Sequence, residues 1–272
     1  TAEIARSAGF TVMGIDRRDF NHGGTRRKGE EYFSGRVDFL VCLTQDALLT
    51  EPGAMAALLA AFDDSCIGAA FGRQLPAADA TPVAEHARAF NYPARSRTVG
   101  PEDRNVLGFK ACFLSNSFAA YRLSALAAVG GFPDNVILGE DTTVTARMLL
   151  AGRSIRYECQ ACVYHSHNYG FADEFKRYFD TGVFHARSPW LMEAFGGASG
   201  EGMRFVMSEL HFLSARSPRS IPAAVLRTVL KLLGYRLGRL ERWLPWGLKH
   251  RMSMFKAYWS HAPQCSAGNP KP

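Results

Sequence analysis

The sequence lacks any apolar run long enough to cross a bilayer. A spanning helix needs about 18 or more consecutive apolar residues, and no such uncharged run occurs in the 272 residues. The six cysteines are irregularly spaced, and the first residues lack the pattern of a signal peptide. We therefore expect no transmembrane helix, and reduced thiols in a cytosolic compartment.

Acidic residues are scarce in the C-terminal quarter. Residues 203–272 carry 12 Lys and Arg but only two Glu, whereas the first 202 residues carry 20 Lys and Arg against 23 acids. A basic segment on a near-neutral body is expected to meet an anionic surface, either phospholipid or nucleic acid. Because no nucleic-acid-binding motif is present, we expect no nucleic-acid partner.

The same segment has the pattern of an interfacial helix. From Ile221 to Leu244, leucine and valine recur at helical spacing, and the basic residues fall largely on another face. Trp243 and Trp246 stand at the end of this stretch. The pattern favours an anionic membrane surface as a partner, bound through residues 221–259. The alternative is that the stripe packs on the main domain as ordinary core.

Two acids stand at the start of a predicted helix. The run after Gly139 is apolar at helical spacing and ends near Gly152, so Glu140 and Asp141 fall in the first turn. Asp141 could simply cap this helix, which would lower its pKa. It could instead take a proton from an attacking hydroxyl. Spacing alone leaves both roles open.

A predicted strand over residues 154–165 follows this helix and leads into two histidines, His165 and His167. Together with Cys159 and Cys162 they would supply four zinc ligands. Neighbouring residues of a strand point to opposite faces, so closing a tetrahedron within this short stretch would need a sharp loop. The geometry argues against a structural zinc site.

A basic, glycine-rich segment nearer the N-terminus suits a phosphate. Residues 17–29 are predicted to form a polar loop between a strand over residues 10–15 and another over residues 37–43. Glycine backbone beside fixed cations can cradle a phosphate, although such loops are common and usually solvated. The candidate residues are His22, Gly23, Gly24, Thr25 and Arg26.

The strand over residues 37–43 is almost continuously apolar, as in a buried parallel strand, and is followed by Asp46. Ligands of open α/β sheets bind beyond the carboxyl ends of the strands. Asp46 could therefore hold a hard metal ion that bridges phosphates, or it could cap a turn. Asn116 interrupts a further predicted strand, residues 109–120, and could line the same pocket.

Strand-like and helical segments alternate along the rest of the chain, which indicates an α/β protein. Helices are predicted over residues 1–8, 52–62 and 171–185, a strand over 67–71, a loop-rich region over 74–105 and a linker over 196–202.

Six motifs occur in order along the chain: FNHGGTR (20–26), LTQDA (43–47), FLSNSFAAYR (113–122), GGFP with GED (130–141), VYHSHNY (163–169) and EFKRYFDTGVFH (174–185). Together they resemble the bacterial rhamnosyltransferases of glycosyltransferase family 2, over about residues 1–190. The resemblance implies a GT-A fold, an α/β architecture with a mixed, mainly parallel sheet flanked by helices. We expect a glycosyltransferase domain over residues 1–195 and a basic amphipathic helical tail over residues 203–272.

The resemblance also implies roles for individual residues. Asp141 matches the family's general base, and Glu140 is the adjacent supporting acid. Asp46 and His165 match ligands of a Mg²⁺ or Mn²⁺ ion on the donor diphosphate, although Thr44 stands where many relatives have a first Asp. The residues expected to contact the donor are His22, Gly23, Gly24, Thr25, Arg26, Gln45, Asp46, Asn116 and Arg177.

The activity implied by the resemblance is inverting transfer of L-rhamnose from dTDP-rhamnose to a lipid-linked saccharide, in O-antigen or other surface-polysaccharide synthesis. Such a protein would be peripheral to the cytoplasmic face of the bacterial inner membrane. Two alternatives are an inverting transferase of another sugar and a catalytically silent protein that binds a sugar nucleotide or scaffolds a membrane. Family members begin with a strand and an acid-bearing loop that have no counterpart here, so we expect an N-terminal truncation and weaker donor binding.

Overall fold

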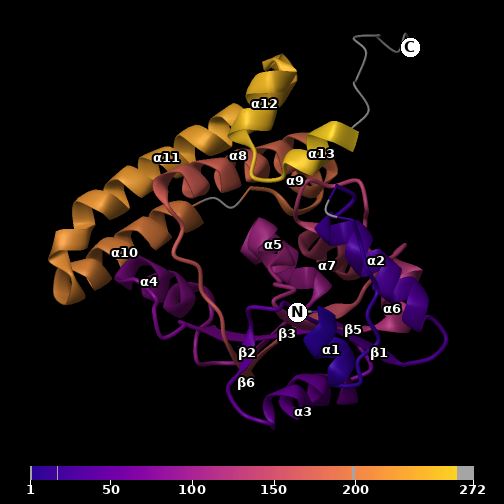
Figure 1. The fold of residues 1–272 in the computed structure, drawn as a ribbon. Helices are drawn as coiled ribbons and strands as arrows, with labels where there is room; N and C mark the ends of the chain where they lie inside the picture. Colours follow the sequence, from indigo (N-terminus) through magenta and orange to yellow (C-terminus); the bar gives the residue numbers. More distant parts are fainter. Residues whose placement is uncertain (1, 17, 198–199, 262–272) are drawn as a thin grey trace.

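The computed structural model, which describes residues 2–16, 18–197 and 200–261, contains one sheet with helices on both faces (Figure 1). The strands are β1 (Phe39–Leu43), β2 (Leu48–Leu49), β3 (Ile67–Leu75), β4 (Arg97–Val99), β5 (Phe118–Arg122) and β6 (Ser154–Tyr164). The helices are α1 (Ala2–Ser7), α2 (His22–Phe33), α3 (Ala54–Leu59), α4 (Pro82–Asn91), α5 (Arg104–Leu107), α6 (Leu123–Ala128), α7 (Glu140–Leu150), α8 (Phe171–Arg187), α9 (Pro189–Phe195), α10 (Glu201–Arg216), α11 (Ile221–Arg239), α12 (Trp246–Met252) and α13 (Lys256–His261).

The sheet is mixed, with strand order β1-β5-β3-β6-β2 and β4 pairing with β6. β3 and β6 run parallel, whereas the other pairings among the described residues are antiparallel. The expected mixed α/β architecture is therefore confirmed, but the parallel part is smaller than expected. β1 shows why: it pairs antiparallel with β5, and a continuous apolar run cannot distinguish a parallel strand from an antiparallel one.

The sheet separates two apolar layers. Ala69 and Phe71 of β3 belong to the larger core, which includes residues of α7 and α8. Ala70, between them on β3, belongs to a second core, which includes Leu58 of α3. In Figure 1, α3 lies on one side of the sheet and α7 with α8 on the other. Side chains that leave a strand on opposite faces thus bury against different helices.

The strongest periodic patterns give the predicted elements. Five helices lie where the sequence predicts them, namely α1, α3, α7, α8 and α11, and so do the strands β1, β3 and β6. Gly139 is the N-cap of α7 in a left-handed conformation (φ 77°), and a Cβ there would meet the ring of Phe184. Glycine is required at this position for both reasons.

Four predicted segments are corrected. Residues 10–15 form no strand, because no described segment pairs with them. Residues 17–29 are mostly helical, because α2 begins at His22. The region 74–105 contains α4 and β4 in place of a long loop. Residues 109–120 begin with a turn of 3-10 helix, so Asn116 precedes β5 and does not interrupt it.

The side chain of Asn21 explains the start of α2. Its Oδ1 accepts the Gly24 N–H, which is the usual N-cap interaction. Gly23 lies directly against the Pro133 carbonyl, where a Cβ would overlap the oxygen. The glycine pair therefore permits close packing of α2, whereas the sequence alone suggested an open loop.

The C-terminal helices pack against the body through α8 and α4. α11 lies along α8 at backbone contact, since a Cβ on Gly234 or Gly238 would overlap the carbonyl oxygen of Phe175 or Phe179. α10 packs beside α4. Among the described residues, no helix combines the length and the apolar character that crossing a bilayer requires.

α11 turns its central cations inward. Arg227 Nη1 lies 3.3 Å from Glu174 Oε1, and Lys231 Nζ lies 3.5 Å from Glu174 Oε2. Six large apolar residues instead face outward, each between 47% and 52% exposed: Val225, Leu226, Val229, Leu232, Leu233 and Leu240. An ordinary surface helix buries its apolar stripe, whereas α11 leaves much of its stripe exposed and packs Leu237 against the core.

Candidate active site

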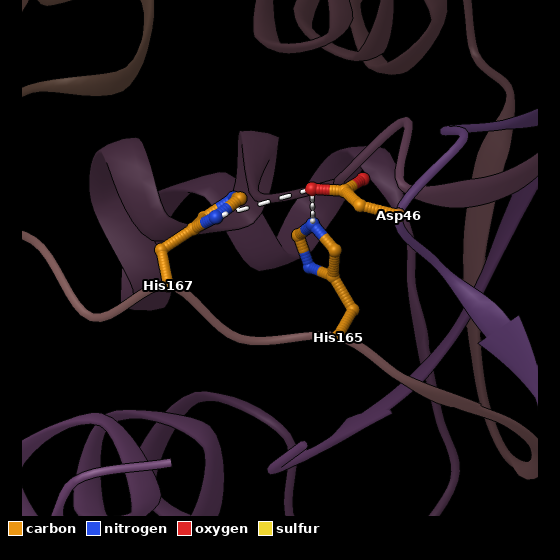
Figure 2. A group of neighbouring side chains, drawn as sticks. All are labelled: Asp46, His165 and His167. Atoms are coloured by element: carbon orange, nitrogen blue, oxygen red, sulfur yellow. Dashed lines mark ion pairs between the residues drawn. The ribbon is translucent and has the colours of Figure 1, made fainter. Parts of the chain in front are cut away.

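Three possible metal ligands meet beyond the carboxyl ends of β1 and β6 (Figure 2). His165 Nε2 is 3.5 Å and His167 Nδ1 is 3.9 Å from Asp46 Oδ2. One ligand atom from each residue can be chosen so that all lie within 4.8 Å of one another. The structure thus brings Asp46 and His165 together, as the resemblance implied. Cys159 and Cys162 lie earlier on β6 and are not part of this group.

His167 is a further potential ligand that the sequence analysis considered only for zinc. The sequence signal is its spacing, because residues two apart in an extended chain point to the same side. One carboxylate and two imidazoles offer an oxygen and two nitrogens as ligands, and imidazole nitrogen suits transition metals. The residues present therefore fit a divalent transition metal.

Burial favours the neutral form of both histidines. Burial and the neighbouring His167 lower the pKa of His165 to about 4, against the opposing charge of Asp46. Burial also lowers the pKa of His167, and the positive charge of Arg177 adds to this effect. Neutral imidazole is the form that binds metals, so neither ring must lose a proton first.

The two acids at the start of α7 differ in their hydrogen-bond partners: two other side chains donate to Glu140, whereas Asp141 accepts from the adjacent Thr142. Glu140 is buried and accepts hydrogen bonds from Arg26 Nη1 at 2.6 Å and from Asn116 Nδ2 at 3.2 Å. The Tyr121 hydroxyl in turn donates to Asn116 Oδ1 at 2.6 Å. Arg26 and Asn116, both predicted to contact a donor, thus also hold Glu140 in place.

Asp141 does not cap α7, since Gly139 is the N-cap. Its Oδ1 accepts the N–H of the next residue, Thr142, at 2.7 Å. Burial raises the pKa of Asp141 to about 7, and the negative charge of Glu140 adds to the rise while Arg26 opposes it. The capping role that the sequence left open is therefore not adopted, and burial outweighs the lowering effect of the Thr142 hydrogen bond. A carboxylate with a pKa near 7 is a competent base at neutral pH.

The predicted phosphate loop is the first turn of α2. The Gly24 N–H donates to the side chain of Asn21, and Gly23 is buried against Pro133, so neither glycine forms an open cradle. Thr25 is held in the helix through its N–H bond to the Asn21 carbonyl. The side chains of His22 and Arg26 are the parts of this turn that lie next to Glu140.

Arg177 acts electrostatically on both parts of the site. Its positive charge lowers the pKa of His22 on one side and of His167 on the other, in each case after the larger effect of burial. The guanidinium sits 5.6 Å from the ring centre of Tyr169. Gln45 is exposed in the turn between β1 and β2, and no described contact involves its side chain.

The C-terminal segment completes one wall of the site. The Phe255 ring packs edge-on to His22, with ring centres 5.4 Å apart. The Met254 N–H donates to Asp180 Oδ2 at 2.8 Å, and Asp180 is fully buried within α8. Of these residues the sequence analysis placed only His22 in the site, because its contact with Phe255 and the contact of Asp180 with Met254 each join residues more than 70 positions apart.

No family model matches the chain. The chain is 47% identical over 267 residues to the O-antigen chain rhamnosyltransferase WbaN of Salmonella anatum, covering 98% of this chain and 84% of that protein. It is 47% identical over 258 residues to the O-antigen chain rhamnosyltransferase RfbN of Salmonella typhimurium, covering 95% and 82%.

A solved structure is also similar. It is the mannosyltransferase PcManGT from Pyrobaculum calidifontis, in complex with GDP-Man and Mn²⁺. The match has a TM-score of 0.48 and 18% identity, and covers 95% of this chain and 70% of that chain.

Proposed function

The chain belongs to the O-antigen chain rhamnosyltransferases and is a glycosyltransferase; from this premise, we propose that it transfers L-rhamnose with inversion from dTDP-rhamnose to a lipid-linked saccharide. The structural observation that carries the proposal is the arrangement of two adjacent carboxylates. Arg26 donates a hydrogen bond to Glu140, and the pKa of Asp141 is raised to about 7. An inverting transferase of another sugar would use the same arrangement.

In the proposed reaction, Asp141 takes the proton from the acceptor hydroxyl. The oxygen forms a bond to the anomeric carbon while the bond from that carbon to the donor diphosphate breaks on the opposite face. The result is a new glycosidic bond of inverted configuration, a protonated Asp141 and a free nucleoside diphosphate. Glu140 raises the pKa of this base and is itself held by Arg26.

The leaving diphosphate needs positive charge. Arg177, whose charge acts on both His22 and His167, would supply part of it. Asp46, His165 and His167 would hold a Mn²⁺ or Mg²⁺ ion, which would stabilise the departing phosphate oxygens as a Lewis acid. Gln45 and the first turn of α2 remain our candidates for further donor contacts.

We assign the outward face of α11 and the residues after it to an anionic membrane surface. Trp243 is 70% and Trp246 53% exposed beyond the end of the apolar face of α11. Arg236, Arg239 and Arg242 are exposed on or next to the same face. An apolar face with Trp at one end and arginines beside it suits the boundary between headgroups and acyl chains. The protein would then act as a peripheral protein at the cytoplasmic face of the inner membrane, where its lipid-linked acceptor lies.

Transfer to a lipid-linked saccharide, measured by mass spectrometry of the product, tests this function. Wild-type protein with Mn²⁺ and dTDP-rhamnose should add one deoxyhexose, whereas Asp141→Asn should add almost none. Other nucleoside-diphosphate sugars should give little product, and a faster reaction with one of them would favour the alternative donor. Equal product from wild type and Asp141→Asn would exclude Asp141 as the base, and no product from either would favour a silent binding protein.

A further inference from the structure

The buried amide of Gln74 lies directly behind the metal-ligand group. Gln74 is on β3, is 2% exposed, and places Oε1 2.9 Å from His165 Nδ1. The guanidinium of Arg88 donates to the same Oε1, and Gln74 Nε2 donates to Ser115 Oγ at 2.9 Å. The sequence analysis singled out neither Gln74 nor Arg88.

These contacts fix which atom of the amide is the oxygen. An arginine side chain can only donate hydrogen bonds, so the amide atom that faces Arg88 must be the acceptor. This removes the usual ambiguity between the oxygen and nitrogen of a glutamine. The same oxygen faces His165 Nδ1, so that nitrogen must carry a proton. In the neutral ring, Nε2 is then the nitrogen with the free lone pair.

The free lone pair points toward another acceptor. His165 Nε2 faces Asp46 Oδ2 at 3.5 Å, and His167 approaches the same oxygen (Figure 2). Two acceptors that face each other repel unless a cation or a proton lies between them. A second proton on His165 would place a charged ring in a buried position, beside the Arg88 guanidinium that shares the same amide oxygen, which is costly. A bound cation resolves the arrangement without that cost.

We propose that Gln74 is a positioning residue, which holds His165 in the tautomer protonated on Nδ1 and so presents a bare Nε2 to a divalent cation. Arg88 and Ser115 orient the amide from either side. The proposal rests on the metal role given under Proposed function. It assigns to Gln74 the task that outer hydrogen-bond partners of metal-binding histidines perform, which is to set the tautomer and the ring orientation.

The tautomer can be measured directly without metal or substrate. Nitrogen-15 NMR of chelator-treated protein reports which ring nitrogen carries the proton, and a His165→Asn variant assigns the signals. Wild type should show His165 protonated on Nδ1. The variant Gln74→Met, which is similar in length but accepts no comparable hydrogen bond, should show a mixture or protonation on Nε2. Protonation of His165 on Nε2 in the wild type would overturn the proposal.

Binding of Mn²⁺ alone, followed through the EPR signal of the free ion, gives the second readout. Gln74→Met should weaken Mn²⁺ binding by roughly 10- to 100-fold. Gln74→Glu should retain the affinity, because a carboxylate accepts from both His165 and Arg88. The control Gln160→Met makes the same change at an exposed position of β6 and should bind as the wild type does.

The outcomes separate this proposal from the metal role on which it rests. If the wild type and Gln74→Met bind Mn²⁺ equally, Gln74 has no positioning role while the metal site stands. If the wild type binds no Mn²⁺, both ideas are overturned. Should Gln74→Met fail to fold, as judged by circular dichroism, the wild-type tautomer and the Gln74→Glu affinity still decide the question.

Discussion

Arg26 and Glu140 form a buried ion pair, with Nη1 and Oε1 2.6 Å apart, that joins the first turn of α2 to the first residue of α7. The pair lies next to Asp141 and acts on its pKa from both sides, since Glu140 raises it and Arg26 lowers it. Burial is the main cause of the raised pKa of Asp141, and two residues more than 100 positions apart in the sequence adjust it further.

Replacing Glu140 by Gln should move the pH dependence of transfer. The variant removes the negative charge beside Asp141 but keeps an oxygen for Arg26, so the pKa of Asp141 should fall from about 7 toward its ordinary value. Activity needs the ionised base, so the acid limb of the kcat/KM profile should shift to lower pH. Glu158→Gln, which also removes a carboxylate paired with an arginine, should leave the limb in place. An unshifted limb in Glu140→Gln would contradict this account.

Asp141→Asn should be inactive but more stable at high pH. Loss of the base should lower kcat by roughly 10²- to 10⁴-fold. The native pKa of Asp141 is raised to about 7, so the folded protein keeps a proton that the unfolded chain loses near pH 4, and stability falls with rising pH between these values. The Tm gain of the variant should therefore be largest above pH 7 and absent below about pH 4. A variant with lower Tm than wild type at pH 8 would show that the carboxylate is stabilising.

Single substitutions should identify the metal ligands. Asp46→Asn, His165→Ala and His167→Ala should each weaken Mn²⁺ binding, measured by calorimetry, by at least roughly tenfold, since each removes one of three ligands. Asp103→Asn, remote from the cluster, should bind as wild type does. Unchanged binding in His167→Ala would reduce the protein ligands to Asp46 and His165.

Leu233→Glu should reduce binding to vesicles that contain anionic lipid. Leu233 is 47% exposed on the outward face of α11, and replacing it would remove about 1.5 kcal/mol of apolar contact and add a repelled charge, a loss of roughly tenfold or more. Val106→Glu, at an 86% exposed position on α5, is the matched control and should bind normally. Co-sedimentation would decide, and equal losses in both variants would indicate a general charge effect.

Gly238→Ala should destabilise the protein through the contact of α11 with α8. A Cβ at Gly238 would overlap the Phe179 carbonyl oxygen, and overpacking of this kind costs about 1–3 kcal/mol. Thermal unfolding should show a Tm several degrees lower. Gly247→Ala in α12, where a Cβ would meet nothing within 4 Å, should leave the Tm unchanged or slightly higher.

The sequence predicts correctly those helices, strands and site residues that depend on local periodicity or on the position of strand ends. α7, β6 and α8 follow from periodicity, and Asp46 and His165 meet because ligands gather beyond the carboxyl ends of strands. The missed helix α2 depends on the cap by Asn21 and on the contact of Gly23 with Pro133. That contact joins distant parts of the chain, so the local pattern of glycines and cations could only suggest a loop.

The orientation of α11 could not be read from its sequence either. Periodicity finds an apolar stripe but does not say which way it faces. The direction is set by Glu174, which pairs with Arg227 and Lys231, and by the glycines at the α8 contact. The raised pKa of Asp141 could not be predicted from the sequence either. It depends on burial and on Glu140, and this burial requires that α2, β5 and α7 pack together.

Met254 donates its N–H to Asp180, and Phe255 packs against His22. The segment around these two residues therefore supports the candidate active site. Truncating the protein before residue 203 would therefore remove both the contacts of Met254 and Phe255 with the site and the proposed lipid-binding face of α11. A shortened enzyme that fails would not reveal which loss disabled it. Membrane binding and sugar transfer can be tested separately by substitutions on the outward face of α11 that leave residues 253–255 unchanged.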